Sequence, residues 1–157
     1  MLTSRRGRAR AHLGDARCWD DFHRAQALLS KAAGHDDPDW SYWFDEAEVL
    51  GARASSHRDM DQPGPAAAAF AQAHAIIDPA HVRTSALYTA RQADALLAKG
   101  EIEHACAAAG YALNLTEAIS SHRSTVPLLE LTERLARYDT TPAVRDLRER
   151  ARAVLTA

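Results

Sequence analysis

The side chains that could bind a metal or transfer protons are scattered along the chain. His104 and Cys106 are two residues apart, which places them on different faces of a helix. Adjacent acidic residues such as Asp20 and Asp21 diverge on a helix and do not share a proton. No histidine forms an HxxxH pair with a third ligand nearby; the eight are His12, His23, His35, His57, His74, His81, His104 and His122. We therefore expect no metal site and no catalytic residue.

Sequence motifs for cofactor binding and nucleophilic catalysis are also missing. The seven glycines are isolated, so they form no phosphate-binding loop, and no GxSxG motif occurs. The sequence thus predicts a protein that is not an enzyme and has no cofactor. A small helical enzyme or phosphotransfer domain remains the least favoured alternative, with His122 beside Arg123 as its nearest candidate site.

Charge and composition exclude several partners. The formal net charge is -2, which gives no general attraction to nucleic acid or to anionic membranes. Arg5, Arg6, Arg8 and Arg10 lack interleaved aromatic residues, so we expect no direct nucleic-acid contact. The longest apolar run, 66–71, is far shorter than the roughly 20 residues that cross a bilayer. No secretory signal is evident, and we expect a cytoplasmic protein.

The two cysteines make no disulfide framework. Cys18 and Cys106 are far apart in sequence and form no CxxC pair, which favours a reducing compartment. A single bond between them also remains compatible with the sequence.

An aromatic cluster is the densest chemical feature of the chain. On a helix, Trp40, Trp43 and Phe44 share one face while Tyr42 turns away. One interpretation is a core plug between two pairs of helices, because aromatic side chains dominate core burial. The other is that one ring, Tyr42, borders a ligand groove.

The elements that carry these residues are predicted to be helices throughout. Alanine makes up about a fifth of the chain and is the best helix former, and no stretch alternates as a strand does. Apolar spacing and turn residues divide the chain into a single domain of four helical hairpins, at about 8–33, 40–77, 79–115 and 119–155. Asp39 is the expected cap of a helix that starts at Trp40, and Thr141 that of one starting at Pro142.

The turns recur at regular intervals. Asp61, Gly100 and Asp139 are each 39 residues apart, and Gly14 precedes Asp61 by 47. Small or short side chains lie at matching offsets: seven before the turn (Ala54, Ala93, Thr132), five after it (Ala66, Ala105, Val144) and twelve after it (Ala73, Ala112, Ala151). Close helix crossings need small side chains at fixed places, so the pattern indicates stacked hairpins. In the first hairpin the large Trp19 occupies a position where a small residue is expected.

These hairpins resemble the tetratricopeptide repeat (TPR). The third matches best, with Ala93, Gly100, Ala105 and Ala112, and the second has Phe70 at the usual aromatic position. The resemblance implies a TPR-like superhelix of about four stacked hairpins, whose first helices line a concave groove that holds a peptide or protein ligand.

Placing the hairpins by their turns gives a candidate groove with mixed acidic and basic groups. Its predicted lining and rim residues are Tyr42, Glu48, Ser55, Arg83, Leu87, Arg91, Asp94, Arg123, Leu129 and Glu133. Such groups can pair with the termini and side chains of a peptide. A merely solvated inner face explains them equally well.

A more specific resemblance covers nearly the whole chain. The segments 13–29, 36–51, 83–113 and 120–135 resemble the C-terminal helical-repeat region of actinobacterial XRE-family helix-turn-helix transcriptional regulators. The resemblance implies a sensory or regulatory domain, whose DNA-binding domain we do not find in this sequence. The alternative is a stand-alone scaffold that joins two proteins. The last helix has a polar coat and the first hairpin does not, so we also expect either a homodimer through the first hairpin or docking of another domain there.

Overall fold

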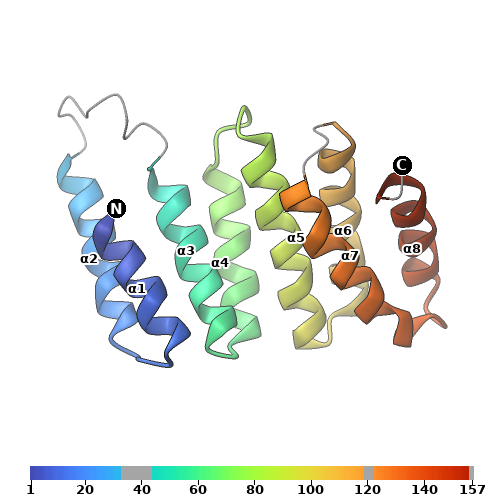
Figure 1. The fold of residues 1–157 in the computed structure, drawn as a ribbon, viewed down its shortest axis with the longest axis horizontal. Helices are drawn as coiled ribbons and strands as arrows, with labels where there is room; N and C mark the ends of the chain where they lie inside the picture. Colours follow the sequence, from blue (N-terminus) through green and yellow to red (C-terminus); the bar gives the residue numbers. More distant parts are fainter. Residues whose placement is uncertain (33–43, 119–121, 156–157) are drawn as a thin grey trace. The chain divides into compact units, whose positions relative to one another are not determined.

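The computed structural model describes residues 1–32, 44–118 and 122–155, and every element in these ranges is helical (Figure 1). The elements are α1 (Leu2–His12), α2 (Cys18–Ala32), α3 (Glu46–Asp59), α4 (Pro63–Ile76), α5 (Val82–Lys99), α6 (Ile102–Glu117), α7 (His122–Leu135), the short 3-10 helix η2 (Ala136–Tyr138) and α8 (Pro142–Leu155). The predicted all-α class is confirmed.

Consecutive helices form antiparallel pairs, and three of the four predicted turns share one backbone feature. Gly14, Asp61 and Gly100 adopt positive φ angles of 72°, 55° and 86°. Glycine reaches this left-handed region without strain, and aspartate is among the few other residues that tolerate it. Asp139 differs, with a φ of -62°, because η2 continues the chain after α7. The chain therefore reverses its direction at all four predicted turns. Three of the reversals use a residue with a positive φ angle, and the fourth uses η2.

The helices fall into two compact units, Met1–Ile76 and Ile77–Ala157. In the first unit, α1 packs against both α2 and α3, and α3 also packs against α4. In the second unit, the hairpins α5–α6 and α7–α8 stack with α5 beside α7 and α6 beside α8. The single domain expected from the sequence is thus built as two bodies, each with two hairpins.

Small side chains make the contacts between paired helices, as the offsets predicted. Ala54, Ala66 and Ala73 in the first unit are fully buried. In the second unit the core contains Ala93, Ala105, Ala112, Val144 and Ala151, together with leucines from α5 to α8. Only Thr132 among the nine positions is half-buried.

The first hairpin follows the same rule with its second helix shifted by one residue. Cys18 and Ala25, rather than Trp19 and Gln26, occupy the buried positions, at 0% and 3% exposure. Seven residues before the turn lies Gly7, where an added Cβ would stand 3.1 Å from Cζ of Phe22. The glycine therefore allows α1 to lie close against α2, and the shift turns Trp19 partly outward.

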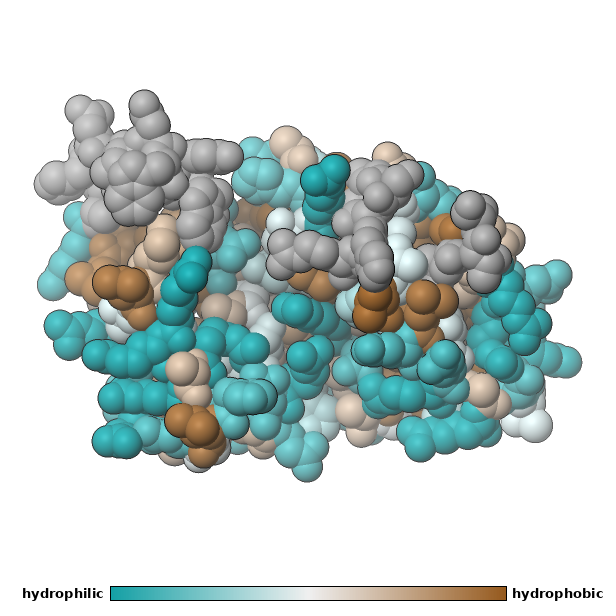
Figure 2. Space-filling model, viewed as in Figure 1, coloured by the Kyte–Doolittle hydropathy of each residue, from teal (hydrophilic) through white to brown (hydrophobic). Residues whose placement is uncertain are grey.

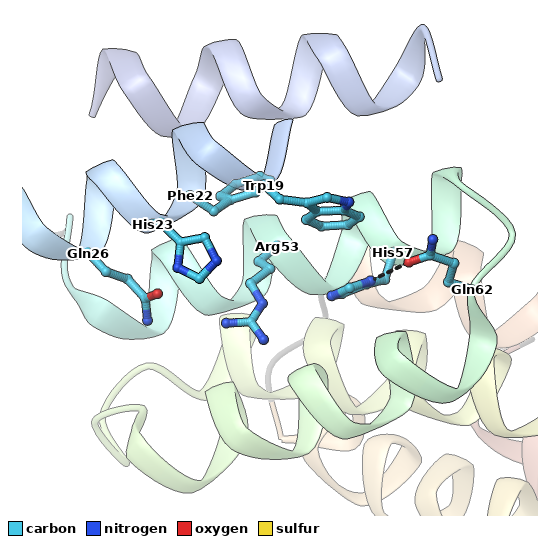
Figure 3. Close-up of a pocket in the computed structure, with 7 residues that line it drawn as sticks. All are labelled: Trp19, Phe22, His23, Gln26, Arg53, His57 and Gln62. Carbon is cyan, nitrogen blue, oxygen red and sulfur yellow. Dashed lines mark hydrogen bonds between the residues drawn. The ribbon is translucent and has the colours of Figure 1, made fainter. Parts of the chain in front are cut away.

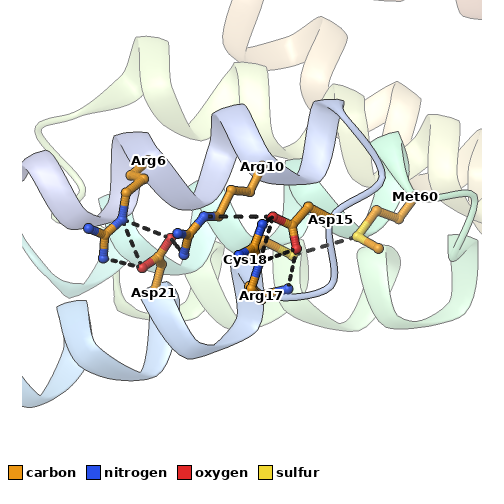
Figure 4. Close-up of polar contacts among 7 residues, drawn as sticks. All are labelled: Arg6, Arg10, Asp15, Arg17, Cys18, Asp21 and Met60. Carbon is orange, nitrogen blue, oxygen red and sulfur yellow. Dashed lines mark hydrogen bonds and ion pairs between the residues drawn. The ribbon is translucent and has the colours of Figure 1, made fainter.

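Three of the arginines at the start of the chain connect α1 to its neighbouring helices. Asp21 of α2 is 2% exposed and accepts hydrogen bonds from Arg6, at 2.5 Å, and from Arg10, at 2.8 Å (Figure 4). Arg8 reaches Asp59 of α3 at 2.6 Å. These charge-assisted bonds hold α1 to both of its neighbours. The helix consequently begins at Leu2, earlier than the expected residue 8.

The start of α3 also differs from the expectation. Its N-cap is Asp45, whose side chain accepts the backbone N–H of Glu48 at 2.9 Å and so satisfies a donor that the first turn leaves unpaired. Phe44 precedes this cap, outside the helix, and packs against the core of the first hairpin. The expected cap Asp39 and the other three aromatic residues of the cluster lie outside the described residues.

The remaining helix ends lie close to their predicted positions. The second helix of the second hairpin begins at Pro63, and α8 begins at Pro142 as predicted. The backbone carbonyl of Thr141 accepts the N–H groups of Val144 and Arg145, at 3.1 and 3.2 Å.

The visible surface is mostly polar, with small separate apolar patches (Figure 2). The first hairpin carries the most exposed leucines, Leu2 at 83% and Leu13 at 82%, whereas the outer face of α8 is charged. The expected self-association through the first hairpin stays a prediction.

The cysteines lie one in each unit, and both are buried free thiols. Cys18 contacts the sulfur of Met60 at 3.6 Å. Burial raises the pKa of both thiols, so they remain protonated at neutral pH and are not activated nucleophiles.

Candidate functional site

The residues predicted to line a groove are divided between the two units. Glu48 and Ser55 belong to α3 of the first unit. Ser55 is 2% exposed and its hydroxyl donates to the carbonyl of Gly51 at 2.9 Å, so it lies in the helix interface. The second unit carries Arg83, Leu87, Arg91 and Asp94 on α5 and Arg123, Leu129 and Glu133 on α7. Tyr42 and the side chain of Arg123 lie outside what the structure describes.

Two small groupings of these predicted residues occur in the second unit. Asp94 of α5 forms an ion pair with Arg134 of α7. Leu129 and Glu133 line a cavity of about 150 Å³ between α7 and α8. Neither grouping holds a buried charge in need of a partner.

A cavity larger than the one between α7 and α8 lies in the first unit, between α2 and α3. It has a volume of about 230 Å³ and is lined by Trp19, Phe22, His23, Gln26, Arg53, His57 and Gln62 (Figure 3). We call it the α2–α3 cavity. The four α2 residues share one helix face, and Arg53 and His57 are one turn apart on α3. The shift of α2 by one residue is what places Trp19 here.

One side of this cavity is aromatic. The rings of Trp19 and His57 stack with centroids 4.2 Å apart and an angle of 24° between their planes. Phe22 is 1% exposed, and its ring centroid lies 6.2 Å from that of Trp19. The wall thus offers ring faces and edges in the range where aromatic groups attract one another.

A hydrogen bond fixes the His57 ring. Its Nδ1 lies 2.8 Å from Oε1 of Gln62, and because an amide oxygen only accepts, Nδ1 donates. Burial lowers the pKa of His57, while the Gln62 bond acts in the opposite direction and is the smaller influence. The imidazole is therefore neutral at pH 7, with Nε2 as an acceptor.

The cavity also contains a cation that no described residue neutralises. Arg53 is half-buried, and among the described residues it has neither an ion pair nor a hydrogen bond. Its guanidinium lies between His23 and His57 (Figure 3). None of the seven lining residues is acidic. The site therefore has a positive potential and donors directed at open space, which suits an anion.

Among the residues that the structure describes, no group of three or more His, Cys, Asp or Glu side chains could hold a metal ion. No helix in the same ranges is both long and apolar enough to span a bilayer.

The sequence did contain a signal for this cavity. Trp19 stood out as too large for its position, and Arg53 and His57 have the spacing of one helix face. What the sequence lacked was the register that brings this face of α3 opposite Trp19.

Comparison with known proteins adds no relative: no family model, no curated protein and no solved structure matches the chain.

Proposed function

We propose that this protein is a non-enzymatic, cytoplasmic helical-repeat module of the TPR-like kind that binds a peptide or protein ligand, and that an anionic group of the ligand enters the α2–α3 cavity. The stacking of hairpins in the second unit and the buried small residues in both units support the repeat architecture.

The proposal rests on Arg53, a half-buried arginine that has no ion pair and no hydrogen bond among the described residues. Arg8, Arg10 and Arg148 are also half-buried, and each of them holds an aspartate. Removing a guanidinium from water without a partner costs free energy, so a structural arginine is normally paired. An arginine that lacks such a partner beside an open cavity gains one when an anionic ligand binds.

The regulatory role implied by the XRE resemblance fits a site of this kind. An occupied cavity would favour one packing of α2 against α3, and a ligand shifts such an equilibrium only if it contacts the two states differently. DNA would be bound by a separate domain.

The second candidate function is a scaffold that joins two proteins, which is favoured by the presence of two compact units.

The experiment is selection of binders from a random peptide library with the purified protein as bait. We expect enriched peptides that bind the wild type, lose binding to Arg53→Met and keep binding to Arg24→Met. Methionine retains the apolar stem of arginine and removes the charge. Arg24 is the matched control because it is exposed on α2 and does not line the cavity.

Circular dichroism would verify that both variants keep the helical content of the wild type. Peptides that bind Arg53→Met as tightly as the wild type, or a selection that enriches nothing, would contradict the proposal.

A further inference from the structure

We propose that the group that fills the α2–α3 cavity is a single aromatic ring carrying one carboxylate. This inference rests on the proposed function and specifies its ligand. The chemistry has two sources: the C-terminal Phe, Tyr or Trp of a peptide, or a free aromatic acid.

The volume limits the occupant to about one ring. A cavity of about 150 Å³ holds benzene, and sites for drug-sized ligands begin at about 300 Å³. The α2–α3 cavity, at about 230 Å³, lies between these values. It has room for a phenyl or indole ring and a short polar group, and not for a nucleotide or a folded segment.

The aromatic wall selects for a planar group. The stacked pair of Trp19 and His57 and the edge of Phe22 present ring surfaces that pair with a further ring at centroid distances of about 4.5 to 7 Å. Phe22 is held in the core, which makes this wall rigid. A planar ring loses less conformational freedom on such a surface than a branched aliphatic side chain does.

The charge pattern selects for one negative charge. Arg53 supplies one permanent cation, and its planar guanidinium matches a carboxylate through two parallel hydrogen bonds. His57 is neutral at pH 7, and Gln62 carries no charge. A phosphate group with nearly two charges would need a second cation in the cavity.

The remaining polar groups can bind the atoms next to the carboxylate. Gln62 uses its amide oxygen for His57, which leaves its amide N–H₂ as a donor. Nε2 of His57 is an acceptor, and Gln26 presents a further side-chain amide at the cavity wall. A ligand with a peptide group before its terminal carboxylate can use the first two, whereas Gln26 lies at the opposite end of the cavity (Figure 3).

The test is isothermal titration with matched acid and amide forms. The probes are acetyl-Gly-Ser-Phe with a free carboxylate, the same peptide as its C-terminal amide, the acid with Ala in place of Phe, and 3-phenylpropionate. We expect the Phe acid to bind at least about tenfold more tightly than its amide, the ratio given by one charge-assisted hydrogen-bonded pair. It should also bind more tightly than the Ala acid.

The variants separate ligand binding from a structural role of Arg53. In Arg53→Met the acid should bind only as weakly as the amide, while the amide itself binds as it does to the wild type. Arg24→Met should keep the full preference for the acid. A structural role would instead weaken both ligands together.

The small acid distinguishes the two sources. Equal affinity of 3-phenylpropionate and the peptide acid supports a free aromatic acid, and much tighter binding of the peptide supports a peptide terminus. Equal binding of acid and amide, no binding of any probe, or a preference that survives in Arg53→Met overturns the inference. If library peptides nevertheless depend on Arg53, the proposed function stands and only this ligand class is wrong.

Discussion

Replacing Gly7 by alanine tests how closely α1 approaches α2. In the interior of a helix, alanine in place of glycine normally stabilises by about 0.5 to 1 kcal/mol. At Gly7 the new Cβ would lie 3.1 and 3.2 Å from two ring carbons of Phe22 and 3.3 Å from Cβ of Asp21. Carbon atoms in good contact are about 3.5 to 4.0 Å apart.

The neighbours of Gly7 have little freedom to move away. Phe22 is 1% exposed, and Asp21 is held by two arginines of α1. Forcing an extra methyl group into such a site costs about 1 to 3 kcal/mol. After subtraction of the helix-propensity gain, we expect Gly7→Ala to lower the free energy of unfolding by about 0 to 2.5 kcal/mol.

Gly110→Ala is the matched control, because Gly110 is also a mid-helix glycine. Its added Cβ would find only Nη1 of Arg150, at 3.7 Å, which is an ordinary contact with a flexible side chain. This variant should gain the full 0.5 to 1 kcal/mol or so. Trp19 belongs to the first unit and the second unit contains no tryptophan, so tryptophan fluorescence in urea follows the unfolding of the first unit, while circular dichroism follows the helices of both units. If both substitutions stabilise equally, the close crossing of α1 and α2 is refuted.

Two further substitutions, each with a matched control, test the ion pairs of the first unit and the helix packing of the second. Asp21→Asn should lower the free energy of unfolding of the first unit by about 1.5 to 3 kcal/mol, the usual contribution of hydrogen bonds to a charged group. Asp15→Asn, in the turn between α1 and α2, should cost less, because the ion pair of Asp15 with Arg17 is exposed to solvent. Equal losses in urea would contradict this ranking. The hydrogen bonds from Arg6 hold the pKa of Asp21 below its usual range. The stabilisation of the folded state by Asp21 is therefore complete above about pH 4 and is lost as the pH falls further. In an acid titration, Asp21→Asn should lack this part of the loss of stability. Ala93→Leu should destabilise the second unit by about 1 to 3 kcal/mol, because Ala93 is fully buried and a larger side chain overpacks the core. Ala98 is exposed on the same helix, so Ala98→Leu should be nearly neutral. Unfolding in urea, followed by circular dichroism, compares the two variants.

The fold was largely predictable because its local signals are strong. Residues with a tolerance for positive φ marked three turns, and small residues at fixed offsets marked the crossings. The first hairpin escaped the rule because counting from a turn assumes a constant turn length. The turn from α1 to α2 is longer than the next two, and the buried positions of α2 come one residue earlier, at Cys18 rather than Trp19.

Long-range partners were not predictable from spacing. The arginines of α1 are bound by Asp21 and Asp59, which are 11 to 51 residues away, and nothing in the periodicity of the first ten residues indicates these pairs. The α2–α3 cavity was missed for the same reason. Arg53 is one of many arginines in the sequence, and it becomes distinctive only when the structure shows it half-buried beside Trp19 and His57, with no acidic partner among the residues described.

The most direct test of the binding site is nuclear magnetic resonance of the labelled protein during titration with acetyl-Gly-Ser-Phe. If the ligand binds in the α2–α3 cavity, the indole signal of Trp19, the side-chain signal of Arg53 and the backbone amide signals around His57 shift together. These shifts reach a plateau as the peptide saturates the site. Shifts confined to Leu87, Asp94 and Leu129 of the second unit would instead support the groove predicted from the sequence and would contradict the α2–α3 cavity as the ligand site.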